Sequence, residues 1–259
     1  MLISIITINF NDLKGLKKTM TSVFDQTFKS IEYIIIDGGS TDGSKEYIEA
    51  YQDSLAYWVS EPDTGIYNAM NKGIDKATGE YLLFLNAGDW LYTKDALAQF
   101  VNKMIVNPNK DIYYGKINVV DKTEWVKEYP KLLSFSYFVK HALPHPASFI
   151  RKDCFVNNYY DESLKIISDW KFFVIGICKN NFTYENVDVV LSNFVFDGIS
   201  SKNPKMVQKE RESVLNKEFP LFMKDYYELI KKEKELKIAQ QPSAFWQGIY
   251  RAYKKILRK

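Results

Sequence analysis

Three short runs of apolar residues are spaced along the first hundred residues of the chain. Residues 2–8 and 31–36 are nearly continuous and rich in β-branched side chains, and residues 81–85 form a third run. Strands buried on both faces of a parallel sheet have this pattern, because neither face meets water. We therefore predict three strands of a parallel sheet.

Amphipathic segments separate these runs. Leu16 and Met20 recur at helical spacing after Asp12, which we expect to cap a helix. Two further helices are predicted, one after Gly65 and one at residues 96–106. This alternation of strands and helices predicts an α/β fold with a Rossmann-like, mostly parallel sheet and helices on both faces.

The second half of the chain has a different pattern. We expect strands at residues 111–120, 124–129, 147–150 and 184–196, and a helix at residues 169–178. The first two strands are expected to pair through a turn at residues 121–122, so that an antiparallel or mixed extension joins the sheet. Residues 203–238 predict a charged helical extension that is interrupted near Pro220.

The composition is that of a globular protein. The 259 residues are 46% hydrophobic and 15% aromatic, which is enough for a substantial core. The formal charge of +3 gives no global field that would attract nucleic acid. Cys154 and Cys178 have neither metal-ligand spacing nor a disulfide framework, and the chain shows no signal peptide and no membrane-spanning run. We expect a cytoplasmic protein without a nucleic-acid partner.

Polar residues follow each of the three predicted strands. Asn9 and Asn11 follow the first, Asp37 with GGSTDGS follows the second, and Asn86-Ala-Gly-Asp89 follows the third. Ligands of open parallel sheets bind beyond the carboxyl ends of the strands, where amides and carboxylates can pair with base edges and ribose hydroxyls. The GxGxxG and GxxxxGKS/T spacings are absent, which argues against dinucleotide dehydrogenases and P-loop enzymes.

The segment 60–73 places two carboxylates, Glu61 and Asp63, immediately before a predicted amphipathic helix. Two interpretations stay open. Thr64 caps the helix while Asp63 is favoured by the positive end of the helix dipole, or the two carboxylates belong to a binding site.

Four segments occur in register over the first hundred residues: ISIITINFN, IIIDGGSTDGS, EPDTGIYNAMNKG and LFLNAGDW. Together they resemble an inverting family 2 glycosyltransferase of the GT-A fold, of the bacterial surface-polysaccharide type. Weaker similarities follow at HPASFIR, SDW and DGISS. The resemblance implies a catalytic domain at residues 1–202, with a nucleotide-sugar-binding half at 1–110 and an acceptor half at 111–202, and a helical extension at 203–259.

The resemblance assigns a nucleotide pocket to the strand ends. Thr7 and Asn9 would line it with Asn11 at its rim, and Asp37 would accept the imide N–H of a uracil-type base. A carboxylate favours uracil or thymine over cytosine, because cytosine offers only an acceptor at that edge. A UDP-sugar donor is therefore expected. The alternative for Asp37 is a residue that bonds within its own turn.

Further donor contacts are implied for the segment 60–73. Glu61 would order the loop, and Asp63 would lie near the base, the ribose or the donor sugar. Asn68 and Lys72 are expected on one helical face because they are four residues apart. Lys72 would either stabilise the departing diphosphate or remain a solvated surface lysine.

The metal motif departs from the family pattern. Many members carry a DxD-type pair of acids, whereas this chain has Asn86 and a single acid, Asp89. The resemblance implies Mn²⁺ or Mg²⁺ at Asp89, with a carbonyl or water-mediated contact from Asn86, because diphosphate oxygens and waters can complete the octahedron. A metal-independent variant is the alternative.

Three positions in the second half are assigned by weaker similarity. Asp169 in SDW matches the base that accepts the hydroxyl proton during inversion, with a helix-start role as the alternative, and Trp170 can instead pack in the core. His145 matches a position near the donor phosphates, the metal or the acceptor, with a core histidine as the alternative. Ser200 lies in DGISS, a predicted turn that implies a flexible phosphate-contacting loop.

The residues after Pro242 combine an apolar stripe with many lysines and arginines. Such a basic amphipathic helix predicts either an interfacial anchor at the inner face of the cell membrane or a helix that docks on its own domain or on a sister subunit in a homo-oligomer. Membrane docking would suit a lipid-linked glycan acceptor.

These features predict an enzyme that transfers a sugar from a UDP-sugar to a hydroxyl of a glycan or lipid-linked acceptor, in surface-polysaccharide or glycolipid synthesis. Two alternatives stay open. One is a degenerate binding or membrane-scaffold protein, because Asn86 and Gly88 stand where acids are common. The other is a sugar nucleotidyltransferase, which is disfavoured because NFNDLKG follows the first strand where a basic glycine-rich loop is expected.

Overall fold

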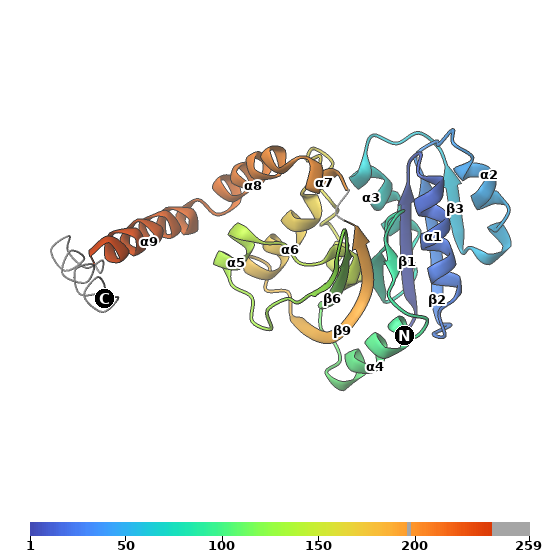
Figure 1. Cartoon of the computed structure of the whole chain (residues 1–259), viewed down its shortest axis with the longest axis horizontal. Helices are drawn as coiled ribbons and strands as arrows, with labels where there is room; N and C mark the ends of the chain where they lie inside the picture. Colours follow the sequence, from blue (N-terminus) through green and yellow to red (C-terminus); the bar gives the residue numbers. More distant parts are fainter. Residues whose placement is uncertain (196–197, 240–259) are drawn as a thin grey trace, which may run out of the picture. The chain divides into compact units, whose positions relative to one another are not determined.

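The computed structural model describes residues 1–195 and 198–239. The chain divides into two compact units, residues 1–212 and 213–259, and each is described by itself. Their boundary lies inside helix α8 (Pro204–Glu218), whereas the predicted extension begins at residue 203. In the first unit, nine strands of the described residues form one curled sheet (Figure 1).

Four neighbouring strands are parallel, in the order β3, β2, β1, β4. They are β1 (Ile3–Asn9), β2 (Ile31–Asp37), β3 (Tyr57–Ser60) and β4 (Tyr81–Phe84). All seven residues of β1 are buried, so this part of the sheet is covered on both faces, as its apolar run predicts. The sequence pattern does not predict β3, because its four residues are only half-buried and form no apolar run.

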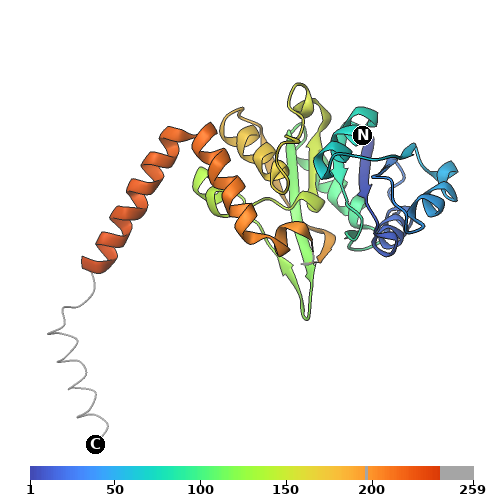
Figure 2. The same cartoon turned by 90° about the horizontal axis from the view of Figure 1, so that it is seen from above.

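The remaining strands extend the sheet in mixed directions, as predicted. β8 (Ser148–Arg151) pairs antiparallel with β4, and β6 (Ile112–Val120) pairs antiparallel with β8. β9 (Tyr184–Val195) lies parallel to β6, and β5 (Trp90–Leu91) pairs antiparallel with β9. β7 (Glu124–Lys127) forms the predicted hairpin with β6, and Figure 2 shows this hairpin projecting from the sheet.

Helices connect and cover these strands. The described helices that begin in the first unit, apart from α8, are α1 (Leu13–Phe24), α2 (Ser44–Glu49), α3 (Ile66–Lys76), α4 (Ala96–Val106), α5 (Phe135–Lys140), α6 (Ser168–Cys178) and α7 (Ile199–Lys202). Short 3₁₀ helices lie at Gln52–Ser54, His145–Ala147 and Lys152–Phe155.

Helices α1 and α3 cover opposite faces of the parallel strands. The ring of Phe24 at the end of α1 contacts Tyr33 of β2, with centroids 5.7 Å apart. Tyr33 is paired with Ile5 in the register, and successive residues of a strand point to opposite faces. Gly73 of α3 lies against Ile6, on the face that α1 does not cover. The predicted double-sided cover is thus confirmed.

Local signals at the helix starts gave one correct and two wrong predictions. The Asp12 carboxylate accepts a hydrogen bond from the Gly15 N–H at 2.9 Å and caps α1, as predicted. Thr64 does not cap α3, because the N-cap position is occupied by Gly65, which has no side chain to accept a bond. Of the predicted turn at DGISS, residues 199–201 belong to α7 instead, and Asp197 lies outside the described residues.

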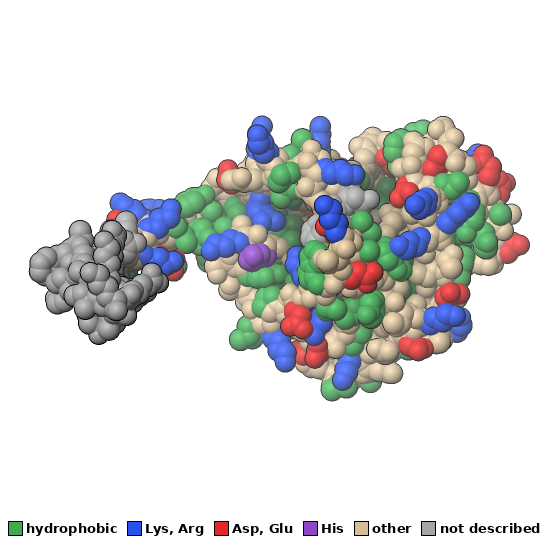
Figure 3. Space-filling model, in the orientation of Figure 1, with side chains coloured by type: hydrophobic (Ala, Val, Ile, Leu, Met, Phe, Trp, Pro, Cys, Tyr) green, Lys and Arg blue, Asp and Glu red, His purple; other side chains and the backbone are tan. Residues whose placement is uncertain are grey.

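The second unit contains the end of α8 and helix α9 (Pro220–Ala239), so the predicted interruption near Pro220 is confirmed. The predicted helix after Pro242 lies outside the described residues. Within residues 1–195 and 198–239, no helix combines the length and the apolarity that a membrane span needs. On the face shown in Figure 3, acidic and basic side chains are interspersed, in keeping with the small net charge.

The close approach of α3 to β1 depends on Gly73. A Cβ at this position would lie 2.5 Å from Cγ2 of Ile6. We expect Gly73→Ala to lower the free energy of unfolding by about 1–3 kcal/mol, because α3 must shift away from the sheet. Urea denaturation measures this change. Gly198→Ala is the matched control, since no atom of the described residues lies within 4 Å of a Cβ there; an equal loss in both variants would contradict the packing explanation.

Candidate functional site

The register of the parallel strands brings three polar residues together at their carboxyl ends. Asn9 is paired with Asp37, and Asp37 is paired with Ser60. The Asp37 carboxylate is fully buried and accepts bonds from Asn9 Nδ2 at 2.7 Å, the Ser40 N–H at 2.9 Å, and the Ser40 and Ser60 hydroxyls, each at 2.6 Å. These bonds hold the ends of β1, β2 and β3 to one another.

Asp37 is charged at neutral pH. Burial raises the pKa of its carboxyl group, but the hydrogen bonds from Ser40, Ser60 and Asn9 outweigh burial and lower the pKa below its usual value. The bond from the Ser40 N–H is the turn interaction that the sequence left open. Because four donors occupy the carboxylate, a ligand N–H reaches Asp37 only when one of the serine hydroxyls turns away.

Two amide oxygens at the strand ends are buried and have no hydrogen-bond partner among the described residues: Asn9 Oδ1 and Asn86 Oδ1. The Ala87 N–H donates to the Ile8 carbonyl at 3.0 Å, which fixes the end of β4 beside the end of β1. A buried carbonyl without a partner is costly. The strand ends therefore have spare acceptor capacity, which suits a ligand that brings N–H groups or a cation.

Thr7 lies behind this cluster and does not face an open site. Its side chain is fully buried, and its hydroxyl bonds the Leu85 carbonyl at 2.7 Å and the Tyr33 hydroxyl at 3.0 Å. Its hydroxyl is therefore bonded within the sheet, and the contact of Thr7 with a nucleotide stays a prediction.

The loops after β1 and β2 are tied together. Asn11 Oδ1 accepts from the Thr41 N–H at 2.9 Å, and the Asn11 N–H donates to Ser40 Oγ at 2.8 Å. Phe10, directly before Asn11, is 66% exposed and lies close to Gly38. The motif-based prediction omits Phe10, although an aromatic residue between two strand-end asparagines was an available signal. Its ring provides a stacking surface at the rim of the cluster.

The segment 61–65 leads the chain from β3 into α3. The Asp63 carboxylate accepts from the Gly65 N–H at 2.9 Å, and it lies so close to Gly38 that a Cβ there would be 2.6 Å from Asp63 Oδ2. Asp63 therefore reaches the loop that follows β2. Glu61 forms an ion pair with Lys72 at 2.7 Å. Lys72 is thus engaged in a surface ion pair, and its contact with a diphosphate stays a prediction.

Helix α3 connects the strand ends with the second half of the sheet. The Tyr67 hydroxyl donates to Asp169 Oδ1 at 2.9 Å. Burial and the negative charge of Asp169 raise the pKa of Tyr67 well above its usual value, so the hydroxyl remains a donor. Asn68 and Asn71 donate to the Glu162 carboxylate at 3.0 and 2.8 Å. Asn68 thus anchors α3, and its contact with the donor stays a prediction.

Asp169 lies half-buried in the first turn of α6. Trp170 beside it is buried and donates its indole N–H to the Phe138 carbonyl at 2.9 Å, so Trp170 packs in the core. The guanidinium of Arg211, from α8, lies over the Trp170 ring, 4.9 Å from its centroid. The motif-based prediction missed Arg211, because this residue is far from SDW in the sequence and lies in an ordinary charged helix.

Polar contacts hold the turn that precedes α6. The Asp161 carboxylate accepts from Lys171 Nζ at 2.6 Å and from the Ser163 hydroxyl at 2.5 Å, and the Asp161 N–H donates to Ser168 Oγ. Burial raises the pKa of Asp161, but Lys171 and Ser163 outweigh it and lower the pKa to about 2. This network fixes the start of α6 and with it the position of Asp169.

His145 belongs to the core. It is 7% exposed, its Nε2 lies 2.8 Å from the Tyr160 hydroxyl, and its ring stacks on Phe84 with centroids 4.9 Å apart. Burial lowers the pKa of His145, although the charge of Asp169 opposes this effect. The ring is packed in the core, as the alternative interpretation expects. The contact of His145 with the donor stays a prediction.

Asp89 is half-buried in the turn after β4, where its N–H donates to the Asn86 carbonyl at 2.9 Å. Within the described residues, no group of three or more His, Cys, Asp and Glu side chains is placed to hold a metal ion. The Asp89 carboxylate and the buried, unpartnered Asn86 Oδ1 are nevertheless hard oxygen donors. They fit Mn²⁺ or Mg²⁺ when a diphosphate and water supply the other ligands.

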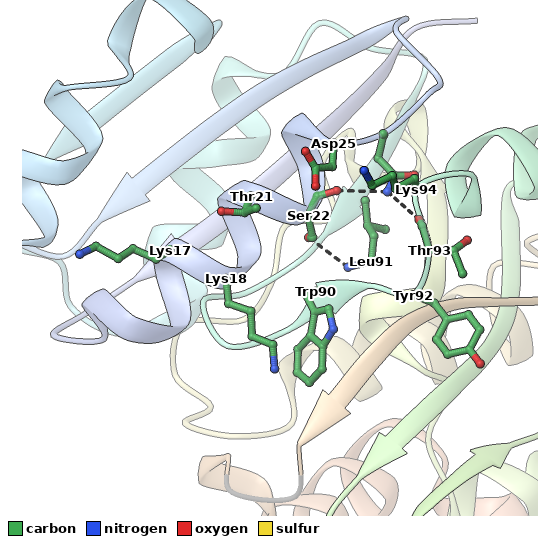
Figure 4. A pocket seen from close by; sticks show the side chains of 11 residues that line it. Lys17, Lys18, Thr21, Ser22, Asp25, Trp90, Leu91, Tyr92, Thr93 and Lys94 are labelled. Carbon is green, nitrogen blue, oxygen red and sulfur yellow. Dashed lines mark hydrogen bonds between the residues drawn. The ribbon is translucent and has the colours of Figure 1, made fainter.

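A cavity of about 540 Å³ lies between α1 and β5 (Figure 4). The Lys18 Nζ lies over the Trp90 ring, 2.9 Å from its centroid. The side chains of Ser22 and Gln26 form hydrogen bonds with neighbouring residues of the protein. None of the predicted site residues lines this cavity. Ser200 is exposed in α7, and its phosphate contact stays a prediction.

Sequence comparison connects the chain with glycosyltransferases. Residues 4–164 match the sequence model described as Glycosyl transferase family 2. An uncharacterized glycosyltransferase of Mycobacterium tuberculosis is 36% identical over 176 residues, which cover 66% of this chain and 67% of the relative. A PGL/p-HBAD biosynthesis glycosyltransferase of Mycobacterium bovis is 28% identical over 207 residues, which cover 76% of this chain and 78% of the relative.

Solved structures share the fold. TarS from S. aureus superposes with a TM-score of 0.65 at 19% identity, over 83% of this chain and 66% of the TarS chain, and TarS has also been solved with UDP. A mannosyltransferase from Pyrobaculum calidifontis, in complex with GDP-Man and Mn²⁺, superposes with a TM-score of 0.57 at 14% identity, over 74% of this chain and 56% of the neighbour. These structures have the GT-A glycosyltransferase fold, and the likeness confirms the predicted fold class.

The network around Asp161 makes a pH-dependent prediction. Because the folded-state pKa is depressed to about 2, the stabilisation is present above the unfolded-state pKa of about 3.9 and is lost as the pH falls toward 2. We expect Asp161→Asn to lower the free energy of unfolding by roughly 1 kcal/mol at pH 7, with a smaller loss at pH 3. Urea denaturation at both pH values measures this, with exposed Asp53→Asn as control; a loss independent of pH would contradict it.

Proposed function

The chain belongs to glycosyltransferase family 2, and on this premise we propose that it transfers a sugar from a UDP-sugar to a hydroxyl of a glycan or lipid-linked acceptor, with inversion at the anomeric carbon. That the protein is a transferase follows from the family. The donor, the acceptor and the stereochemistry are the proposed part.

The observation that carries the proposal is the hydrogen bond between Tyr67 and Asp169. The Ser60 hydroxyl donates to Asp37 at the end of β3. The segment 61–65 follows Ser60, and Tyr67 lies in the first turn of α3 directly after this segment. One short stretch of chain therefore links the polar cluster at the strand ends to the half-buried Asp169 carboxylate of helix α6. A donor site and a candidate base joined in this way are what a direct transfer between two substrates requires.

The strand ends would hold the nucleotide. Asn9 Oδ1 is a buried acceptor without a partner, and Asp37 is a charged acceptor whose serine donors can rotate. This set offers acceptors and suits the imide N–H of uracil, whereas cytosine offers an acceptor at the same edge. The exposed ring of Phe10 would stack on the base. TarS, which shares the fold, binds UDP, and this supports the choice of base.

Asp89 and Asn86 would hold the divalent cation. When bound, a Mn²⁺ or Mg²⁺ ion supplies positive charge that stabilises the departing diphosphate. The P. calidifontis mannosyltransferase of the same fold was solved with Mn²⁺, which supports this assignment. Asp63, which reaches the loop after β2, would contact the ribose or the donor sugar.

Asp169 would act as the base. The acceptor oxygen attacks the anomeric carbon, the bond between that carbon and the diphosphate oxygen breaks, and the hydroxyl proton passes to the Asp169 carboxylate. The nucleoside diphosphate leaves with the bonding electron pair. Tyr67 holds one carboxylate oxygen and leaves the other to face the acceptor, so the base is oriented before the substrate arrives.

The acceptor is proposed to be a glycan or a glycolipid. The M. bovis relative is a PGL/p-HBAD biosynthesis glycosyltransferase, which supports assembly of a glycolipid or surface glycan. Action at the inner face of the cell membrane, through the basic helix predicted after Pro242, remains part of this proposal.

Asp169→Asn tests the base. We expect the rate of UDP release from a UDP-sugar in the presence of a glycan acceptor to fall by roughly a factor of 10³ or more, because the proton has no acceptor, while the thermal shift caused by UDP is unchanged. Exposed Asp53→Asn is the control and should keep full turnover. Full activity in Asp169→Asn would exclude this residue as the base; UDP binding without turnover in the unaltered chain would favour the scaffold alternative.

Chelation tests the metal. We expect UDP to raise the melting temperature more with Mn²⁺ than with EDTA, and Asp89→Asn to remove most of this difference, because the metal loses its only carboxylate from the motif. Differential scanning fluorimetry with UDP, with and without Mn²⁺, measures both effects. A UDP shift that is the same with Mn²⁺ and with EDTA would show metal-independent binding.

A further inference from the structure

Arg211 is a cation beside the candidate base that the proposed reaction does not use. Its guanidinium lies over the Trp170 ring, 4.9 Å from the ring centroid, and its Nε is buried without a hydrogen-bond partner among the described residues. A buried guanidinium N–H usually has an acceptor, because leaving such a donor unpaired is costly. The unpaired Nε of Arg211 therefore points to an acceptor group that a ligand brings.

The position of Arg211 is fixed by its neighbour in the sequence. The Glu210 carboxylate accepts the backbone N–H groups of Lys165 at 2.9 Å and of Ile166 at 3.1 Å. These two residues belong to the turn that leads into α6. Glu210 and Arg211 thus fasten α8 to both sides of Asp169, at the turn before it and at Trp170 after it. A cation held in this way is pre-organised for binding.

Arg211 is partly buried. Burial lowers the pKa of its guanidinium, and the charge of Asp169 opposes this effect through space. Even so, a guanidinium stays charged at neutral pH. A positive charge that is partly desolvated binds an oxyanion more strongly than an exposed lysine does.

The stereochemistry of inversion indicates whether Arg211 contacts the acceptor or the diphosphate of the donor. Inversion places the attacking hydroxyl and the departing diphosphate on opposite sides of the anomeric carbon. Asp169 must lie on the side of the hydroxyl, because it takes the hydroxyl proton. Arg211 lies over Trp170, the residue that follows Asp169 in α6, and on this placement we assign it to the acceptor side.

We propose that Arg211 binds an oxyanion of the acceptor, a phosphate or a carboxylate located close to the hydroxyl that is glycosylated. This inference rests on the proposed function and narrows its acceptor to anionic glycans or sugar phosphates. The guanidinium edge pairs with two oxygens at once, which orients the acceptor as well as attracting it. Trp170 supports the flat guanidinium and limits its movement.

Binding of three small probes tests the proposal in the full-length protein with UDP present. The probes are N-acetylglucosamine 1-phosphate, methyl glucuronide and the neutral methyl N-acetylglucosaminide. Isothermal titration calorimetry measures the affinity of each probe. We expect an anionic probe to bind roughly tenfold or more tightly than the neutral one, the effect of one charge-assisted contact. The phosphate and carboxylate probes distinguish the two oxyanions. Equal binding of all three probes would overturn the proposal without any variant.

Variants assign the preference to Arg211. Arg211→Gln should remove the preference for anionic probes and leave the neutral probe unchanged, and Arg211→Lys should restore part of it, since lysine keeps the charge but not the fork. Lys209→Gln, an exposed residue of the same helix, removes the same charge and should retain the preference. Loss of the preference in Lys209→Gln, or its retention in Arg211→Gln, would overturn the proposal.

The same experiment separates this inference from the proposed function. If UDP alone produces no thermal shift, the nucleotide-sugar proposal fails, whatever the probes do. If UDP binds and the probes show no preference for charge, only the role of Arg211 fails. A preference for anionic probes that is lost in Arg211→Gln, with the UDP shift unchanged, supports both.

Discussion

The site is organised around one buried carboxylate. Asp37 is fully buried, and four hydrogen bonds from Asn9, Ser40 and Ser60 keep it charged. Without these donors a buried charge of this kind would destabilise the fold by several kcal/mol. The ends of three strands must therefore stay in register, and the end of β3 fixes where the segment 61–65 and helix α3 begin. Through Tyr67, α3 then reaches Asp169, so the position of the candidate base depends on the same contact set.

Helix α6 is held mainly by contacts from outside the helix. Its N-cap residue makes no side-chain cap, and the start is instead fixed by Asp161 with Lys171, by Ser168, and by Glu210 from α8. At such a helix start, the first backbone N–H groups can interact with a nearby negatively charged group. Asp169 is placed at this end, where a carboxylate is stabilised without being consumed by a capping bond.

The fold could be predicted from the sequence because strands and helices are indicated by the pattern of apolar residues within short segments. The strands β1, β2 and β4 can be predicted from their continuous apolar runs alone. In contrast, β3 is short and half-buried, and it is identified as a strand only by its pairing with β2 in the structure. The site was less predictable, because side-chain roles depend on residues distant in the chain. Lys72 is occupied by Glu61, and His145 is buried against Phe84. Arg211 can be identified as a candidate site residue only from the structure, in which it lies over Trp170.

Charge balance connects the two ends of the site. Lys72 is paired with Glu61, and Arg211 lies over Trp170, next to Asp169 in the sequence, so neither cation is assigned to the strand ends. The acids of the metal motif are reduced to Asp89, which weakens attraction for a free divalent ion but also lessens repulsion of a diphosphate. Under the proposed function, the ion would gain most of its ligands from the nucleotide, and the nucleotide would gain its missing positive charge from the ion. Each would then raise the affinity for the other by the same factor, so that metal and nucleotide would bind as a unit.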